Sequence, residues 1–208
     1  MTGGLRGAFV TGTDTGVGKS WVAAWLTRSW EADYWKPVQS GTVDGWDADI
    51  VRQVAPDAVI HPSRHGLSAP LSPHVAAQLA GVTIRLEDFS LPATDRPLVV
   101  EGAGGVLVPL NERDLMADLM ARAGLPVVVT ARSGLGTINH SLLTLEALRA
   151  RGVEAAGVIL VGPANPANRA AIERFGRVAV VAELPPLDDL AALRRHPPLV
   201  WRPWRTVP

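Results

Sequence analysis

The sequence predicts an α/β fold with a doubly wound, mainly parallel sheet and helices on both of its faces. Short aliphatic runs recur along the chain without apolar–polar alternation, as in strands that are covered on both faces. Segments with helical spacing lie between these runs, so strands and helices alternate. A glycine-rich stretch joins the first aliphatic run to the first helical segment. In such sheets ligands bind beyond the carboxyl ends of the strands, so the loops that leave the strands are the candidate functional segments.

Taken in chain order, each predicted strand is a run of aliphatic or β-branched residues, which favour a buried sheet. These runs cover residues 8–11, 33–36, 98–101, 127–130, 156–161 and 178–181. The segments between them carry apolar residues at helical spacing and predict helices over residues 19–31, 48–54, 73–79, 113–123, 137–150 and 167–175. Residues 56–71 and 82–97 contain several Pro, Ser and Asp residues and no long period, so we expect irregular connections there.

Length and composition favour one globular domain over residues 1–208. A chain of 208 residues suits a single core, and 47% hydrophobic against 19% charged residues excludes a disordered chain. The tail, residues 195–208, is rich in Arg, Pro and Trp, and we expect a last short strand there followed by a loosely ordered end. The 20 Lys and Arg residues balance the 20 Asp and Glu residues, so no nucleic acid or membrane partner is expected.

The absence of cysteine excludes disulfides, iron–sulfur clusters, thiolate zinc sites and a cysteine nucleophile. Residues 1–7 lack the basic start and apolar run of a signal peptide. No apolar stretch approaches the roughly 20 residues that a membrane-spanning helix needs. We therefore expect a cytoplasmic protein.

A phosphate-binding loop is predicted at residues 12–20, which read GTDTGVGKS between the first strand and the first helix. In such a loop the backbone N–H groups and the helix N-terminus face the phosphates, a lysine reaches the β- and γ-phosphates, and a Ser ligates Mg²⁺. The loop is a variant, because Thr13 stands where the usual pattern has its first glycine. The expected nucleotide ligands are Asp14, Thr15, Gly16, Val17, Gly18, Lys19 and Ser20.

Two further strand ends carry charged candidates. Lys36 precedes Pro37, which disfavours helical backbone at residue 36 and keeps the lysine extended at the same sheet edge as Lys19. Glu101 ends a strand and leads into a glycine-rich segment, so its carboxylate is expected near the phosphates. Mg²⁺ prefers one or two carboxylates besides phosphates and waters. The candidate carboxylates are Asp44, Asp47, Asp49 and Glu101.

Of these carboxylates, Asp47 is placed to cap the helix that begins near Ala48, which is a structural role. Asp49 is therefore the expected metal ligand together with Ser20 and Glu101, with Asp47 as the alternative. A second anion pocket is expected at Gly136, Thr137, Ile138 and Asn139, where a helix start leaves backbone N–H groups free.

Five segments together resemble the dethiobiotin synthetase family. They are residues 10–20 (VTGTDTGVGKS), 35–41 (WKPVQSG), 72–74 (SPH), 101–105 (EGAGG) and 134–140 (GLGTINH), and the resemblance extends over roughly residues 7–160. It implies a homodimeric P-loop NTPase-like fold. It also implies a Mg²⁺- and ATP-dependent ligase that closes the ureido ring of dethiobiotin from 7,8-diaminononanoate and CO₂, in biotin biosynthesis. The family pattern also favours Asp49 as the metal ligand.

The resemblance also implies roles for individual residues. The reaction would pass through a carbamate, its phosphorylation by ATP, and attack by the second amine. Lys36 would hold the carbamate and the transferred phosphoryl group, with Lys19 and Thr15 as the other catalytic residues. Glu101 and Gly104 would contact the nucleotide, and Asn139 with its neighbours would bind the substrate carboxylate from the other subunit. The remaining implied substrate contacts are Ser40, Ser72 and Pro73.

One departure from the family pattern concerns the nucleotide base. Many members carry an adenine-reading Asn after the strand that ends near residue 161, where this chain has Val161 and Gly162. Loose base selectivity is therefore expected. Two other functions are alternatives: a switch ATPase of the partitioning or nitrogenase-reductase type, and a small-molecule kinase. The switch ATPases carry a second lysine early in the loop, where this chain has Asp14.

Overall fold

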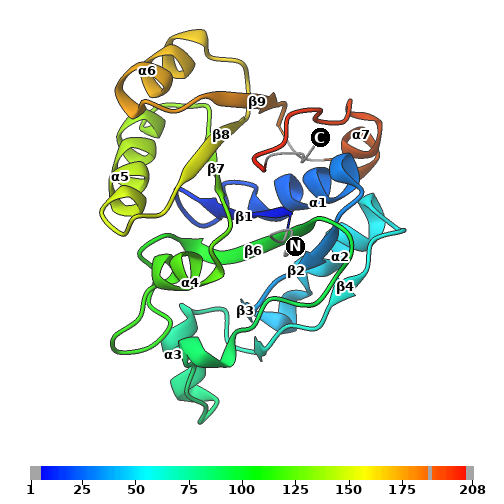
Figure 1. Ribbon diagram of the computed structural model, residues 1–208, viewed down its shortest axis with the longest axis vertical. Coiled ribbons are helices and arrows are strands. Elements are labelled where there is room, and N and C mark those ends of the chain that lie inside the picture. The colour runs from blue at the N-terminus through cyan, green and yellow to red at the C-terminus, as the bar shows by residue number, and fades with distance from the viewer. Residues whose placement is uncertain (1–5, 187–188, 205–208) are drawn as a thin grey trace, which may run out of the picture.

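A seven-stranded sheet forms the centre of the computed structural model, which describes residues 6–186 and 189–204. All of its pairings are parallel, and the strand order is β4-β2-β6-β1-β7-β8-β9 (Figure 1). The strands are β1 (Gly7–Gly12), β2 (Asp33–Trp35), β4 (Ile60–His61), β6 (Leu98–Gly105), β7 (Val127–Arg132), β8 (Ala155–Val161) and β9 (Val180–Leu184). A separate two-stranded sheet pairs β3 (Val38–Ser40) with β5 (His65–Leu67).

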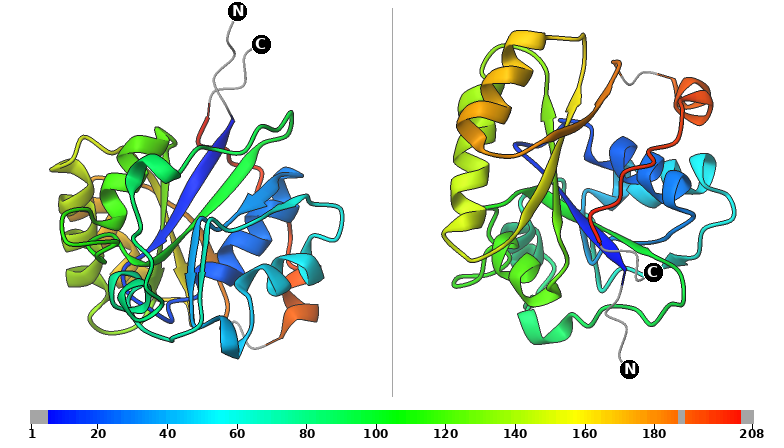
Figure 2. Two further views of the ribbon diagram at one scale, coloured as in Figure 1. Left: turned by 90° about the horizontal axis from the view of Figure 1, so that it is seen from below. Right: turned by 45° about the horizontal axis from the view of Figure 1, so that its top comes forward.

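Helices cover both faces of the sheet, which confirms the predicted fold class (Figure 2). One face packs against α1 (Lys19–Trp30), α2 (Asp47–Val54) and α7 (Leu190–Arg195). The other face packs against α3 (Pro73–Leu79), α4 (Met116–Ala123), α5 (Thr137–Arg149) and α6 (Pro166–Gly176). Because the central strands are buried on both sides, their aliphatic residues point alternately into the two cores: Phe9 faces one and Val10 the other.

The predicted strands and helices all form, with shifted ends. The helix predicted from residue 113 begins at Met116, because the Asn111 side chain accepts hydrogen bonds from the backbone N–H groups of Arg113 and Asp114 and holds a tight loop there. The structure adds β3 and α7. It also adds β4 and β5, which lie in the segment predicted to be irregular, and two short 3₁₀ helices, η1 (Thr42–Asp44) and η2 (Leu86–Asp88).

The described part of the tail packs against α1 without forming the expected strand. The indole N–H of Trp25 donates to the Pro197 carbonyl at 3.0 Å, and that of Trp30 donates to the Trp201 carbonyl at 2.9 Å. The rings of Trp30 and Trp204 meet edge to face with centroids 4.9 Å apart. The backbone carbonyls of this segment thus bond to side chains instead of a strand ladder. Residues 205–208, for which loose order was also expected, lie outside the described residues.

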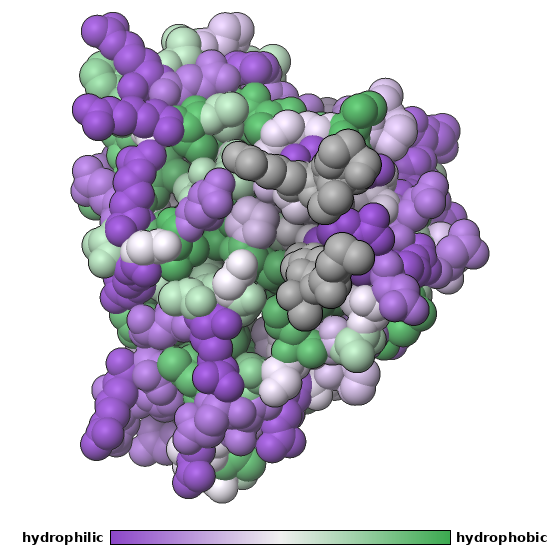
Figure 3. Space-filling model, viewed as in Figure 1, coloured by the Kyte–Doolittle hydropathy of each residue, from purple (hydrophilic) through white to green (hydrophobic). Residues whose placement is uncertain are grey.

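The surface is mixed in character. In the view of Figure 3, hydrophilic side chains dominate the edges of the molecule and apolar patches lie between them. Among the described helices, none combines the length and the apolar character needed to cross a bilayer.

Candidate functional site

The glycine-rich loop lies at the carboxyl end of β1, between the ends of β6 and β7. A Cβ atom on Gly12 would lie 2.8 Å from the Val17 side chain and 2.9 Å from the Asp14 carbonyl, so only glycine fits there. Gly16 and Gly18 have φ angles of 70° and 96°, a region that L side chains rarely adopt. The loop thus depends on glycine for its tight curvature.

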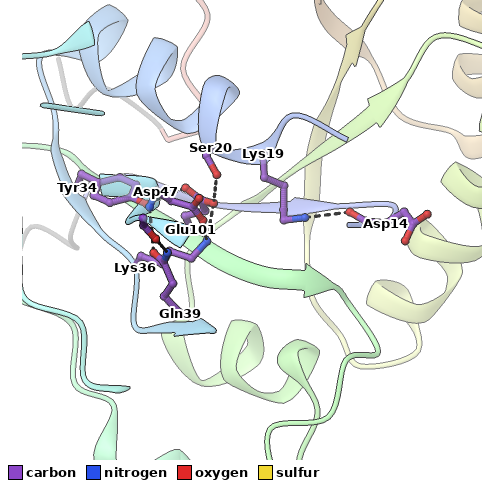
Figure 4. Close-up of polar contacts among 9 residues, drawn as sticks. Asp14, Lys19, Ser20, Tyr34, Lys36, Gln39, Asp47 and Glu101 are labelled. Atoms are coloured by element: carbon purple, nitrogen blue, oxygen red, sulfur yellow. Dashed lines mark hydrogen bonds and ion pairs between the residues drawn. The ribbon is translucent and has the colours of Figure 1, made fainter. Parts of the chain in front are cut away.

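The amino end of α1 is open toward this loop. The helix begins after Gly18 with no side-chain cap and no acidic residue in its first turn. Its free N–H groups and its positive dipole end therefore favour an anion. The ammonium group of Lys19 donates to the Asp14 carbonyl at 2.9 Å across the loop (Figure 4).

A buried polar cluster lies beside the loop, built on Glu101 (Figure 4). The Oε1 atom of Glu101 accepts from Ser20 Oγ at 2.8 Å and from Lys36 Nζ at 2.7 Å. Its Oε2 atom accepts from the Tyr34 hydroxyl at 2.7 Å. Lys36 Nζ also donates to Asp47 Oδ2, so one ammonium group bridges two carboxylates. Glu101 is fully buried and Lys36 is 5% exposed, which makes the cluster part of the protein interior.

Burial and the charge of Glu101 act in opposite directions on the pKa values of Lys36 and Lys19, and in the same direction on the pKa of Tyr34. Burial opposes the charge of Lys36, but Glu101 and Asp47 outweigh it and raise the pKa of Lys36. Burial alone would raise the pKa of Asp47, yet the charge and hydrogen bond of Lys36 lower it. For Lys19, burial lowers the pKa and Glu101 offsets this only in part. Burial and Glu101 raise the pKa of Tyr34, which stays a protonated donor at neutral pH.

In the structure, the two aspartates of α2 have the opposite roles to those predicted from the sequence: Asp49 caps the helix and Asp47 lies in the cluster. Asp49 was the expected metal ligand, but its Oδ2 accepts from the Trp46 N–H at 3.4 Å at the helix start, and its other oxygen pairs with Arg52 on the surface. Asp47 was expected to cap the helix and instead contacts Lys36 in the cluster. The physical reason is helical geometry, because the third residue of the first turn reaches back to the cap position. Asp49 therefore lies outside the cluster and Asp47 inside it.

Gln39, on β3, holds the segment that carries Asp47. Its side-chain N–H₂ group donates to the Gly45 carbonyl at 2.9 Å, and its side-chain oxygen accepts from the Asp47 backbone N–H at 3.1 Å. Gln39 is 4% exposed, whereas Gly45 is exposed and Asp47 half-buried, so the side chain anchors a surface segment from the interior. No sequence pattern predicts this contact, because a single side chain joins the two segments.

We expect Gln39→Ala to lower both stability and turnover. Two hydrogen bonds are lost from a half-buried segment, and each contributes about 0.5–1.5 kcal/mol to the unfolding free energy. Asp47 then loses its fixed position against Lys36, so kcat should fall. Asn111→Ala is the matched control, because Asn111 also bridges a loop, donating to the Ile84 carbonyl and accepting from Asp114 N–H. Denaturant unfolding and steady-state kinetics measure both effects. A Gln39→Ala enzyme with unchanged kcat would contradict the assignment.

A cavity of about 970 Å³ opens over the loop and the cluster and collects most of the predicted site. The predicted residues that line it are Thr15, Gly16, Val17, Gly18, Lys19, Ser20, Lys36, Ser40, Ser72, Pro73, Glu101 and Gly104. Lys19 and Lys36 thus face one cavity, as expected. Asp47, Val161 and Gly162 line it as well.

Several lining residues were not predicted. Arg132 ends β7 and donates to the Thr15 carbonyl at 3.2 Å, and its place at the carboxyl edge of the sheet could have identified it. The others are Trp21, Ile50, Pro70, Leu71, Ala103, Val108 and Pro186. These residues are mainly apolar and carry no motif, so the sequence offered no signal for them.

The expected second anion pocket is not part of this cavity. Gly136, Thr137, Ile138 and Asn139 lie at the start of α5 and are absent from the lining of the cavity within one chain. Gly136, at the cap position, makes no side-chain hydrogen bond, and the Thr137 N–H donates to the Gly134 carbonyl at 3.2 Å. The N–H groups of Ile138 and Asn139 have no partner among the described residues. Asp14 also lies outside the lining, because its carboxylate turns back to the Thr15 N–H at 2.7 Å.

The oxygen atoms of the cluster suit a hard cation. Ser20, Asp47 and Glu101 present a hydroxyl and two carboxylates at one end of the cavity. Among the residues that the structure describes, no group of three or more His, Cys, Asp or Glu side chains forms a metal cage. Mg²⁺ usually takes one or two carboxylates and completes its shell with phosphates and waters, so this donor set fits Mg²⁺ bound together with a triphosphate.

Solved structures share the fold at low sequence identity. A ParA family ATPase from Chlorobium tepidum superposes with a TM-score of 0.54 over 91% of this chain and 87% of its own, at 10% identity. A putative plasmid partition protein from Borrelia burgdorferi gives a TM-score of 0.54 over 92% and 89% of the two chains, at 9% identity. Likeness at this level concerns the fold alone.

Sequence relatives are much closer. A family model described as an AAA domain matches residues 6–194. The ATP-dependent dethiobiotin synthetase BioD of Paramagnetospirillum magneticum is 59% identical over 90% of this chain and 92% of its own. The corresponding protein of Brucella ovis is 48% identical over 90% and 89%. The bifunctional biotin biosynthesis protein BioCD of Bordetella avium is 55% identical, with the match covering 41% of its length. The chain belongs to the ATP-dependent dethiobiotin synthetase family.

Proposed function

We propose that this protein is an ATP- and Mg²⁺-dependent ligase that forms dethiobiotin from 7,8-diaminononanoate and CO₂, a step of biotin synthesis. The observation that carries the proposal is the shared cavity, in which Lys36, Glu101 and Asp47 adjoin a phosphate loop ending in Lys19. A reaction among anions needs this combination of fixed positive charge and hard oxygen donors. The names of the close relatives support the same activity.

The nucleotide is bound by the loop and the first turn of α1. The backbone N–H groups of residues 16–18 and the ammonium group of Lys19 hold the β- and γ-phosphates, and Gly104 borders the same space. The Asp14 carboxylate occupies the Thr15 N–H, and Asp14 lies outside the cavity lining, so neither residue offers its backbone N–H in this arrangement. Ser20, Glu101 and Asp47, in place of Asp49, would hold Mg²⁺, which supplies neutralisation of the triphosphate charge when bound. Glu101 already aligns the Ser20 hydroxyl through their hydrogen bond.

The reacting groups meet at Lys36. One amine of the substrate carries a carbamate, whose oxygen attacks the γ-phosphorus and releases ADP. The second amine then attacks the carbonyl carbon, a C–N bond forms, and inorganic phosphate leaves with loss of a proton. Lys36 holds the carbamate and the transferred phosphoryl group. Its raised pKa keeps it charged at neutral pH, and Thr15 at the loop tip contributes a polar contact. No protein nucleophile takes part.

The substrate occupies the part of the cavity that Ser40, Ser72 and Pro73 line. We assign the helix start at residues 136–139 to the distant carboxylate of the substrate, bound across a homodimer by the second copy. The N–H groups of Ile138 and Asn139, which have no partner among the described residues, support this assignment. Active protein that sediments as a monomer would contradict it. A cytoplasmic location and the lack of nucleic acid or membrane partners stay predictions.

One assay tests the activity and separates it from a kinase. The protein is mixed with 7,8-diaminononanoate, bicarbonate, Mg²⁺ and ATP, and the product is identified by mass spectrometry. A ligase forms the cyclic urea, requires bicarbonate and releases inorganic phosphate. A phosphorylated product that forms without bicarbonate would identify a small-molecule kinase and overturn the proposal. ATP hydrolysis without a diamine would favour a switch ATPase.

We expect weak discrimination among nucleotide bases. Val161 and Gly162 line the cavity at the end of β8, and no Asn or Gln side chain appears among the described lining residues. Without a side-chain amide the base is held by shape and backbone groups. The preference for ATP over GTP and CTP, measured as kcat/KM, should stay below about a hundredfold, or about 2.7 kcal/mol. A stronger preference would show that another group reads the adenine.

A further inference from the structure

We propose that Tyr34 is a positioning residue for Glu101, whose metal-facing oxygen it orients from the interior of the protein. The inference rests on the proposed function, since Glu101 is assigned there to Mg²⁺. Tyr34 does not line the cavity and is fully buried, so it acts only through Glu101.

The sheet brings the two residues together. β2 and β6 are neighbours, and Tyr34 lies in register with Val99. Glu101 follows Val99 by two residues, so its side chain leaves the same face of the sheet as Tyr34 does. The phenol therefore reaches Glu101 from the adjoining strand, and the hydroxyl donates to Oε2 at 2.7 Å (Figure 4).

This hydrogen bond makes the two oxygens of Glu101 unequal. Oε1 faces Ser20 and Lys36, the groups at the nucleotide, at 2.8 and 2.7 Å, whereas Oε2 is engaged by Tyr34 alone. A carboxylate has lone pairs on both oxygens, and the contacts of Ser20 and Lys36 hold Oε1 alone. Without the Tyr34 hydroxyl, Oε2 would have no partner among the described residues and the carboxylate could turn about its bond to Cγ. Partners behind a metal-ligating carboxylate fix its orientation and tune its affinity. Tyr34 is such a partner, because it contacts the oxygen of Glu101 that does not face the proposed metal site.

If the hydrogen bond only stabilised the fold, its removal would lower stability without weakening metal binding. The chain offers a matched control for this alternative. Thr94 donates its hydroxyl to the carboxylate of Asp33, at the start of β2, at 2.6 Å. Asp33 is 3% exposed. Thr94→Val and Tyr34→Phe thus each remove one hydroxyl donor from a buried carboxylate with little change of shape. Thr94→Val also removes the acceptor of the Arg96 N–H, so the control is at least as disruptive to the structure. Only Tyr34 adjoins the proposed metal site.

The first test measures metal binding without turnover. Mn²⁺ is titrated in the presence of ADP and followed by electron paramagnetic resonance. Tyr34→Phe should weaken Mn²⁺ binding by about tenfold, and Thr94→Val should leave it unchanged, although both lower the melting temperature. Mn²⁺ affinity that is the same in Tyr34→Phe and in the wild type would overturn the proposal. A wild-type protein that fails to bind Mn²⁺ with ADP would instead overturn the proposed function, and the role of Tyr34 with it.

The second test needs no substitution, because Tyr34 is the only tyrosine in the sequence. Tyrosine labelled with ¹³C at Cζ gives one side-chain resonance that reports the hydrogen bond to Glu101. Metal bound at Oε1 would draw electron density from the carboxylate and weaken Oε2 as an acceptor. The resonance should therefore shift when Mg²⁺ and ADP are added together, and far less with ADP in the presence of a chelator. If the resonance does not shift at saturating Mg²⁺ and ADP, Tyr34 does not respond to metal at Glu101 and the proposal is refuted. This result can be obtained even if Tyr34→Phe does not fold.

Discussion

Replacing Lys36 by alanine is expected to abolish ring closure and to destabilise the fold. The variant loses the ammonium group that faces the carbamate and the phosphoryl group, and kcat should fall by about a hundredfold to a thousandfold or more. It also leaves Glu101 buried without its cation. Breaking a buried ion pair from one side costs about 3–5 kcal/mol of unfolding free energy. Steady-state kinetics and denaturant unfolding measure the two losses separately.

A double variant separates the chemical loss from the structural one. Lys36→Met with Glu101→Gln removes both buried charges, so much of the stability should return while activity stays absent. Asp47, whose side chain is 34% exposed, can then be solvated by water. A Lys36→Ala enzyme whose kcat lies within about tenfold of the wild-type value would overturn the role assigned to Lys36, whatever its stability.

Lys19→Ala is expected to remove activity without a comparable loss of stability. Lys19 neutralises the phosphates in the proposed complex, so kcat/KM for ATP should fall by at least about a hundredfold. In the free protein, burial lowers its pKa, which means that the fold does not favour its charge. The group makes one hydrogen bond, to the Asp14 carbonyl, and no ion pair among the described residues.

The two alanine variants should differ in stability. Lys19→Ala should unfold close to the wild-type denaturant midpoint, whereas Lys36→Ala should unfold well below it. Lys19→Arg serves as the control that keeps the charge but changes its shape. Equal destabilisation by Lys19→Ala and Lys36→Ala would contradict the view that only Lys36 belongs to the structural cluster.

The sequence was sufficient for the main elements of the fold because the central strands are nearly continuous aliphatic runs without apolar–polar alternation. β3, β4 and β5 escaped prediction, since two or three residues are too few to show a period. The loop motif identified Lys19 and Ser20, and predicted strand ends identified Lys36 and Glu101. For Glu101 the predicted end was wrong, because β6 continues through the glycine-rich segment to Gly105 and Glu101 lies inside the strand. These positions follow from local pattern combined with the rule that parallel strands end at one edge of the sheet.

The rest of the site depends on contacts between distant segments. Tyr34 and Glu101 are 67 residues apart in the chain, and their hydrogen bond exists only because β2 and β6 are neighbours. The choice between Asp47 and Asp49 depended on the first turn of a helix, where a shift of one or two residues exchanges a cap for a site residue. Sequence spacing alone does not resolve that shift.

The position of β1 in the middle of the sheet has a consequence for biosynthesis. The ribosome delivers the phosphate loop early, but the neighbours of β1 begin only at Leu98 and Val127. Until both have emerged, the nascent chain carries an apolar strand with two open edges, a state prone to association with other chains. Prematurely terminated chains would therefore be bound by chaperones or degraded by proteases. Bound nucleotide can stabilise the nascent chain only after β7 has been synthesised, which is past the middle of the sequence.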